Sequence, residues 1–284
     1  NSDFNKPVPL YKVIEDTGVT PVIAMPIMGA DAGNNLGSGG DFYVTAGRFT
    51  GARGGSEFWA RTAYFNAQAN TLFSRGTMTG VSSSTRYLSH VFTFKAPNGG
   101  IDNQRPIIIK GNKYDLTIRA DLIEASTYGS NKIVALVKTS VTPFDGNPHT
   151  IFITIDAMSL ANSYLYYDND NTGSLSKQKD VNENIDIVGN VEMFGNTGVF
   201  KGEVGMQYVT NSYINFTQEA NRNKFIDQLG YPRDLTQQIE DGDIPNPLIY
   251  MKFDDTTALG TNSGTGGNFT VAGTVTAGAD ADEI

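Results

Sequence analysis

Residues 149–157, HTIFITIDA, decide the fold class of this chain, because every position from 150 to 155 holds a β-branched or aromatic residue. Such residues fit a pleated strand better than a helix. Residues 163–168, SYLYYD, follow after a short connection, and residues 87–94, YLSHVFTF, are rich in aromatic and β-branched side chains. All three segments are typical of β-strands.

Segments of the same character recur along the chain, roughly one in every ten to twenty residues, with polar and Gly-rich stretches between them. The further segments are residues 43–49, 56–65, 105–111, 114–123, 131–141, 185–194 and 201–209. This spacing predicts an all-β fold, an antiparallel β-sandwich or jelly roll whose two packed sheets cover residues 42–210. The residues expected on its buried faces are Phe58, Trp59, Ile118, Leu136, Phe152 and Ile155.

A single segment, residues 218–229, is predicted to be helical. Thr217 precedes it as an N-cap, and Gly230 and Pro232 follow where a helix ends. Its apolar residues, expected to pack outside the sandwich, are Phe225, Ile226 and Leu229. The fold class is therefore all-β with one short C-terminal helix.

The composition excludes several kinds of chemistry. The chain has 284 residues, no Cys and two His, so thiol nucleophiles, disulfides and cysteine zinc sites are absent. The formal net charge is −9, and residues 234–284 contribute one Lys against nine acidic residues. Such a chain does not bind nucleic acid through a general positive field. No apolar run approaches the roughly 18 residues of a membrane span, so membrane insertion is not expected.

Two stretches contain weak candidates for ligand binding. Residues 168–173, DNDNTG, begin like a calcium loop, with Asp168 and Asp170 as its first acids. The twelfth position of such a loop needs an acid and here holds Lys179, so a hairpin turn is favoured and calcium is the alternative. Trp59 is the other candidate, because its ring suits a sugar, although a place in the core is favoured. No metal or cofactor is otherwise predicted, and His90 and His149 are expected to be structural.

From about residue 54 to residue 229 the chain resembles a laminin-G-like domain of the concanavalin-A-like lectin/glucanase superfamily. The segments that carry the resemblance are SEFWARTAYF (56–65), TLFSRG (71–76), HTIFITIDAMSLANSYLYYD (149–168) and VFKGEVGMQYV (199–209). In the third segment Asp156, Leu165 and Tyr166 fit the family's pattern, whereas Ile155 stands where the family usually has Trp. The resemblance implies the same sandwich fold.

Residues 213–235, YINFTQEANRNKFIDQLGYPRDL, resemble a tail of bacteriophage and gene-transfer-agent virion proteins that carry this domain. The same superfamily includes glucanases, whose catalytic acids stand at the ends of a Glu-Ile-Asp-Ile-Val-Glu strand. The nearest match here is residues 184–189, with Asn184 and Gly189 at those two ends. Retaining hydrolysis needs both carboxylates, so this chain is not expected to be an enzyme.

The two ends of the chain carry an internal repeat. Residues 21–25, PVIAM, recur as residues 247–251, PLIYM, and GGDFYV (39–44) recurs as GGNFTV (266–271). The sequence predicts strands over residues 248–253 and 268–275. The first of these, residues 248–253, is the candidate assembly strand, and it is expected to bury Leu248, Ile249, Tyr250, Met251 and Phe253. The second copy could pair within its own sandwich, fill an edge on a neighbouring subunit, or begin a further domain.

The resulting division of the chain is an N-terminal strand and Gly-rich loop (1–41), a laminin-G-like sandwich (42–216), a helix and linker (217–243), and the repeated strand (244–284). The leading hypothesis is a non-enzymatic structural protein of a phage-like virion, a tail fibre or tip component or a capsid decoration protein. Its expected partners are copies of itself, other virion proteins and host surface glycan. Its expected location is the virion, after assembly in the bacterial cytoplasm. The alternative is a carbohydrate-binding module of a secreted or cell-surface bacterial protein.

Overall fold

The chain divides into two units, residues 1–57 and 58–284, and every residue that the computed structural model describes belongs to the second. The described ranges are 63–65 (backbone), 71–99, 103–110, 113–128, 132–168, 173–195, 200–227, 230–253 and 257–277. Several positions named above lie outside them: Phe58, Trp59, Asp170, Leu229 and the first copy of the repeat.

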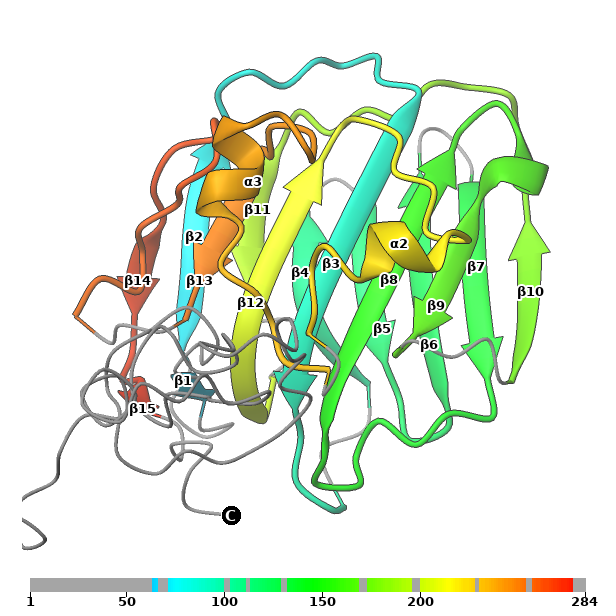
Figure 1. Ribbon diagram of the computed structural model, residues 1–284. Helices are drawn as coiled ribbons and strands as arrows, with labels where there is room; N and C mark the ends of the chain where they lie inside the picture. Colours follow the sequence, from blue (N-terminus) through cyan, green and yellow to red (C-terminus); the bar gives the residue numbers. More distant parts are fainter. Residues whose placement is uncertain are drawn as a thin grey trace, which may run out of the picture. The chain divides into compact units, whose positions relative to one another are not determined.

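The first sheet is antiparallel throughout and has the strand order β15-β1-β12-β3-β8-β9, with β13 pairing β12 off this path (Figure 1). Its strands are β1 (Ala63–Phe65), β3 (Tyr87–Lys95), β8 (Pro148–Asp156), β9 (Tyr164–Tyr167), β12 (Gly202–Thr210), β13 (Ile249–Lys252) and β15 (Thr276–Ala277). The three segments first singled out in the sequence include β8, β9 and β3, which lie side by side.

The second sheet is also antiparallel and has the order β10-β7-β6-β5-β4-β11-β2-β14. Its strands are β2 (Leu72–Thr77), β4 (Gln104–Ile109), β5 (Tyr114–Ile118), β6 (Leu122–Tyr128), β7 (Lys132–Thr139), β10 (Ser174–Gln178), β11 (Asn190–Met193) and β14 (Thr270–Ala272). The two sheets pack face to face, so the predicted all-β antiparallel sandwich is confirmed.

One hydrophobic core fills the space between the sheets. Ile118 and Leu136 of the second sheet meet Ile155 of the first sheet there, and all three are fully buried as predicted. Burying a side chain of this size contributes about 1.5–3 kcal/mol each. Phe152 is also buried, but three residues before Ile155 it points to the opposite face of β8.

A second hydrophobic cluster covers the outer face of the first sheet. Strand residues Val91, Phe152, Met206, Tyr208 and Tyr250 form its floor. The chain after β12 crosses over them and contributes Ile214, Phe216, Phe225, Ile226, Leu235 and Ile244. This segment includes the helices α2 (Glu219–Arg222) and α3 (Thr236–Glu240), and Figure 1 shows α2 in front of the first sheet. Strands β3 and β8 are consequently buried on both faces.

The predicted helix over residues 218–229 is wrong in length and in its cap. Helix α2 has four residues, its N-cap is Gln218, and the Thr217 hydroxyl donates to Asn215 Oδ1 at 2.6 Å. The backbone then turns back at Gly230, whose φ is +85°, so that residues 225–227 pair with residues 231–233. These pairs use backbone groups that a longer helix would need. The predicted burial of Phe225 and Ile226 outside the sandwich is confirmed, whereas α3 was not predicted.

The C-terminal copy of the repeat forms strands, as predicted, although they are shorter. Strand β13 pairs β12 from Ile249 opposite Val209 to Lys252 opposite Met206, and β14 pairs β2. Four of the five residues that the sequence predicts to be buried here, Leu248, Ile249, Met251 and Phe253, lie in the core between the sheets, and Tyr250 is buried in the outer cluster. Among the described residues, no helix is long and apolar enough to cross a membrane.

Candidate functional site

One corner of the first sheet's outer face carries partly exposed tyrosines. There Tyr87, at the start of β3, is paired with Asp156, at the end of β8. Both residues are an even number of positions from side chains of the outer cluster, so both face outward. Tyr164 of the neighbouring strand β9 faces the same way, because Tyr166 two residues later packs against that cluster.

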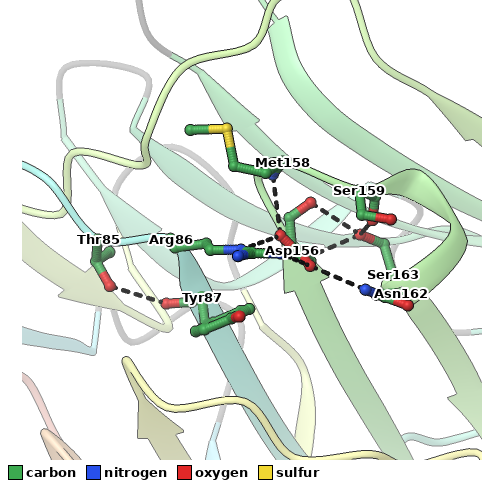
Figure 2. Close-up of polar contacts among 8 residues, drawn as sticks. All are labelled: Thr85, Arg86, Tyr87, Asp156, Met158, Ser159, Asn162 and Ser163. Carbon is green, nitrogen blue, oxygen red and sulfur yellow. Dashed lines mark hydrogen bonds and ion pairs between the residues drawn. The ribbon is translucent and has the colours of Figure 1, made fainter.

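A buried carboxylate holds this corner together (Figure 2). Arg86 makes a bidentate hydrogen-bonded pair with Asp156: Nε donates to Oδ1 and Nη2 donates to Oδ2, each at 2.9 Å. The Met158 amide donates to Oδ1 at 3.0 Å, and Asn162 Nδ2 donates to Oδ2 at 3.1 Å. Ser163 Oγ accepts the Asp156 amide at 2.9 Å. These bonds tie the start of β3 to the loop between β8 and β9, which includes a short 3₁₀ helix, η2 (Leu160–Asn162).

The chemistry of Asp156 follows from these bonds. Its side chain is 1% exposed, whereas that of Arg86 is 46% exposed. Burial alone would raise the pKa of Asp156, but the hydrogen bonds from Arg86, Asn162 and Met158 outweigh burial and hold the pKa below its ordinary value. Asp156 is therefore ionised at neutral pH and engaged on both oxygens. It fixes the direction of Arg86 and is not placed to act as a general acid or base.

One tyrosine ring lies beside this guanidinium, and two further tyrosines lie close to that ring. Arg86 lies 4.9 Å from the centre of the Tyr87 ring, and Tyr213 packs edge-on against Tyr87 with the ring centres 5.4 Å apart. Burial, and then the neighbouring Tyr164, Asp156 and Tyr87, raise the pKa of Tyr213, so these groups lie close together. We call Arg86, Tyr87, Tyr164 and Tyr213 the tyrosine patch.

A lysine from the other sheet supports the tyrosine patch. Lys177 of β10 places Nζ 4.4 Å from the centre of the Tyr164 ring and donates to the Leu160 carbonyl at 3.1 Å. The patch therefore combines flat aromatic surface with a partly exposed, fixed cation. Sugar rings offer apolar faces for such aromatic surface and hydroxyl groups for such donors. No group of three or more metal-ligating side chains occurs among the described residues.

The predicted candidate Asp168 lies at the opposite end of β8, beside His149. Its Oδ2 is 2.9 Å from His149 Nδ1 and its Oδ1 accepts the Thr150 amide at 2.8 Å, while Asp145 Oδ1 lies 2.9 Å from His149 Nε2. Burial lowers the pKa of His149, but the two carboxylates outweigh burial, so that pKa is raised overall. The connection after Asp168 passes from β9 in the first sheet to β10 in the second. It is therefore not the predicted hairpin.

The other sequence-predicted positions do not join the tyrosine patch. Trp59 and Asp170 are outside the described residues, and the strand from Leu248 to Phe253 is separated from Tyr87 by β12. His90 is fully buried with Nδ1 2.7 Å from the Tyr114 hydroxyl, and burial lowers its pKa to about 3. His90 therefore stays neutral, in keeping with a structural role.

Comparisons with known proteins were made at three levels. No protein-family model matches this chain, and no curated protein matches it. Among solved structures it is similar to the LG4-5 domains of the mouse laminin alpha1 chain, at 12% identity and a TM-score of 0.39, over 56% of this chain and 44% of that one. It is also similar to the LG1-3 region of the laminin alpha2 chain, at 14% identity and a TM-score of 0.40, over 57% and 29%.

A third similar structure is the binding domain of botulinum neurotoxin serotype C1, at 9% identity and a TM-score of 0.38, over 61% of this chain and 52% of that one. Each match covers less than two thirds of the solved chain. These are partial similarities of fold. The all-β sandwich itself rests on the two antiparallel sheets of this chain, and it is the fold class that the strand pattern predicts.

Proposed function

We propose that this chain is a non-enzymatic binding domain that recognises glycan through the tyrosine patch. The observation that carries the proposal is the fixed Arg86 guanidinium beside Tyr87, with two further partly exposed tyrosines, Tyr164 and Tyr213, at the same corner of the sheet. Because Asp156 already orients Arg86, little side-chain freedom is lost when a ligand binds, which favours affinity.

The electrostatics of Asp156 and His90 are consistent with a binding role. Asp156 is held ionised by four donated hydrogen bonds, and His90 is kept neutral inside the core. Neither group has a pKa near neutrality, where a general acid or base is most effective. Glycan recognition needs only the fixed surface that Asp156 stabilises through Arg86.

The finer proposal is that the domain works as a structural protein of a phage-like virion, in a tail fibre or tip or as capsid decoration. Its support is the sequence resemblance of residues 213–235. In the structure this segment covers the outer face of the first sheet and supplies Tyr213 to the tyrosine patch. The alternative is a carbohydrate-binding module of a secreted or cell-surface bacterial protein. Labelling the chain on purified particles and locating it by electron microscopy separates the two.

A glycan array tests the binding proposal, followed by titration of the strongest hit. Tyr213→Ala is expected to raise the Kd at least about tenfold, which corresponds to about 1.4 kcal/mol. Tyr128→Ala is the matched control, because Tyr128 is a half-buried tyrosine of the second sheet with Lys132 beside its ring. Its affinity should be unchanged, and melting temperatures should show that both variants fold. A hit whose affinity survives Tyr213→Ala, or an array without any hit, contradicts the proposal.

A further inference from the structure

The C-terminal copy of the repeat closes the sandwich at one end. We call residues 247–271 the closing unit: its first strand, β13, pairs residues 206–209 of β12, and its last, β14, pairs residues 72–74 of β2. One short segment thus completes an edge in each sheet. We call the place that it fills, along β12 and β2, the closing slot.

Asn262 holds the closing unit in shape. Its Oδ1 accepts the Tyr250 amide at 2.7 Å, and its Nδ2 donates to the carbonyls of Leu248 at 2.9 Å and Gly267 at 3.1 Å. The backbone amide of Asn262 donates to Asn268 Oδ1 at 3.0 Å. The side chain is 7% exposed, so one residue supports both strands of the unit from within.

Glycine is required at several positions of the closing unit. A Cβ at Gly264 would stand 2.7 Å from the Leu248 carbonyl oxygen, and a Cβ at Gly266 would stand 2.5 Å from the same atom. Gly260 is similarly close to the Phe269 carbonyl, and Gly267 has a φ of +83°. These contacts are with backbone, so a side chain could not be accommodated by a change of rotamer.

The N-terminal copy carries the same required residues. At a constant shift of 227 positions, Asn35 corresponds to Asn262, and further identities follow at the other required positions. They are Gly33, Gly37, Gly39, Gly40, Phe42 and Val44, which correspond to Gly260, Gly264, Gly266, Gly267, Phe269 and Val271. At a shift of 226, Pro21, Ile23 and Met25 correspond to Pro247, Ile249 and Met251. Asp41 replaces Asn268 and keeps its acceptor oxygen.

The main difference lies on the side that faces away from the sandwich core. Tyr250 packs its ring in the outer cluster. Its hydroxyl accepts a hydrogen bond from the Leu235 amide at 2.7 Å and donates one to Asp234 Oδ1 at 3.1 Å. Ala24 corresponds to Tyr250 and cannot make these contacts. The N-terminal copy therefore matches the inner side of the closing slot but lacks the outer anchor, which explains why the C-terminal copy fills the slot here.

We propose that the closing slot is a docking site for residues 21–44 of a second copy of this chain. The sequence of each chain holds two copies of the unit, and the C-terminal copy fills the described closing slot. Among the described residues one further strand follows the closing unit, the two-residue β15, which pairs β1 and would have to separate from it when the closing unit leaves. Filling one chain's slot with its neighbour's N-terminal copy joins chains head to tail, the heterologous contact from which fibres are built.

Engineered disulfides test this exchange, because the chain has no cysteine of its own. Gln207 is the register partner of Met251, so Gln207→Cys with Met251→Cys should give a disulfide-linked monomer after oxidation with diamide. Gln207→Cys with Met25→Cys should give linked dimers and larger species whose yield rises with protein concentration. Gln207→Cys with Met28→Cys, three residues out of register, is the matched control and should give few disulfide-linked dimers.

The substitution Tyr250→Ala sharpens this test, because it removes the advantage of the C-terminal copy. It should raise the yield of linked dimers from the Met25→Cys pair about tenfold at equal concentration. Melting curves and the Met251→Cys pair verify that each variant is folded. A Met25→Cys pair that links only within one chain overturns the second-copy assignment. A yield no higher than that of the Met28→Cys control overturns the docking itself.

A synthetic peptide of residues 21–44 provides an independent measurement. Labelled peptide should bind the Tyr250→Ala chain saturably, followed by fluorescence anisotropy, whereas the same peptide with Asn35→Ala should bind at least about tenfold more weakly. Equal binding by the two peptides would show that the sequence match does not determine docking.

Discussion

Removing the Tyr250 hydroxyl tests whether the chain after β12, which covers the outer face of the first sheet, is held to the closing unit by this group. In Tyr250→Phe the ring remains, but the Leu235 amide loses an acceptor at 2.7 Å. Leu235 is fully buried, so its N–H is left without a partner unless water reaches it. A lost hydrogen bond costs about 0.5–1.5 kcal/mol, and an unsatisfied buried donor costs about 1–3 kcal/mol. We expect the free energy of unfolding to fall by about 2 kcal/mol.

Thermal unfolding measures this effect directly. For a chain of this size about 2 kcal/mol corresponds to a drop of roughly 4–8 °C in melting temperature. Tyr166→Phe is the control, because Tyr166 is a half-buried tyrosine of the same face, and its contact with Arg222, 4.6 Å from the ring centre, needs only the ring that Phe keeps. It should change stability by less than about 0.5 kcal/mol. Equal melting temperatures for the two variants would refute the argument.

Three further predictions follow from other parts of the structure. Thr217→Ala should change the free energy of unfolding by less than about 0.5 kcal/mol, because the hydroxyl is exposed and caps no helix. A loss of about 1 kcal/mol or more in urea unfolding would show instead that the hydroxyl does act as an N-cap. Gly266→Ala should cost about 1–3 kcal/mol, because its Cβ meets the Leu248 carbonyl, and an unchanged urea midpoint would contradict that clash. His149 should titrate above its ordinary value of about 6.5 in proton NMR, while His90 should not titrate between pH 5 and 8. Because its folded pKa is raised, His149 contributes stability that is full below about pH 6.5 and is lost as pH rises through the folded pKa. The stability difference between the wild type and His149→Gln should therefore shrink on going from pH 5.5 to pH 8.5, and a difference independent of pH would refute the ion pairing.

Local sequence pattern predicts the strands well because each strand's two faces have distinct environments. Ile155 and Phe152 show this: their odd spacing places one between the sheets and the other under the outer cover. The same logic predicts the buried face of the closing unit at Ile249 and Met251. These predictions need only side-chain alternation and apolar content.

The tyrosine patch could not be predicted in this way. Tyr87, Tyr164 and Tyr213 come from three segments, and they meet through strand register and the path of the chain after β12. His149 presents the same difficulty, since its partners Asp145 and Asp168 come from two different connections. The one local signal for the patch is the density of tyrosine in residues 163–168.

The position of Lys177 makes the two flanks of the sandwich unequal. β10 is an edge strand, and its lysine leans inward over Tyr164 of β9, the edge strand of the other sheet. Burial already lowers the pKa of Lys177, and a further strand added there would remove more water from its charge. Inward-pointing charges of this kind protect sheet edges against pairing with other chains. Pairing of a further strand from another chain is thus disfavoured at the β9 and β10 edges. An assembly of these chains would therefore extend from the opposite flank of each sandwich, which gives it a direction.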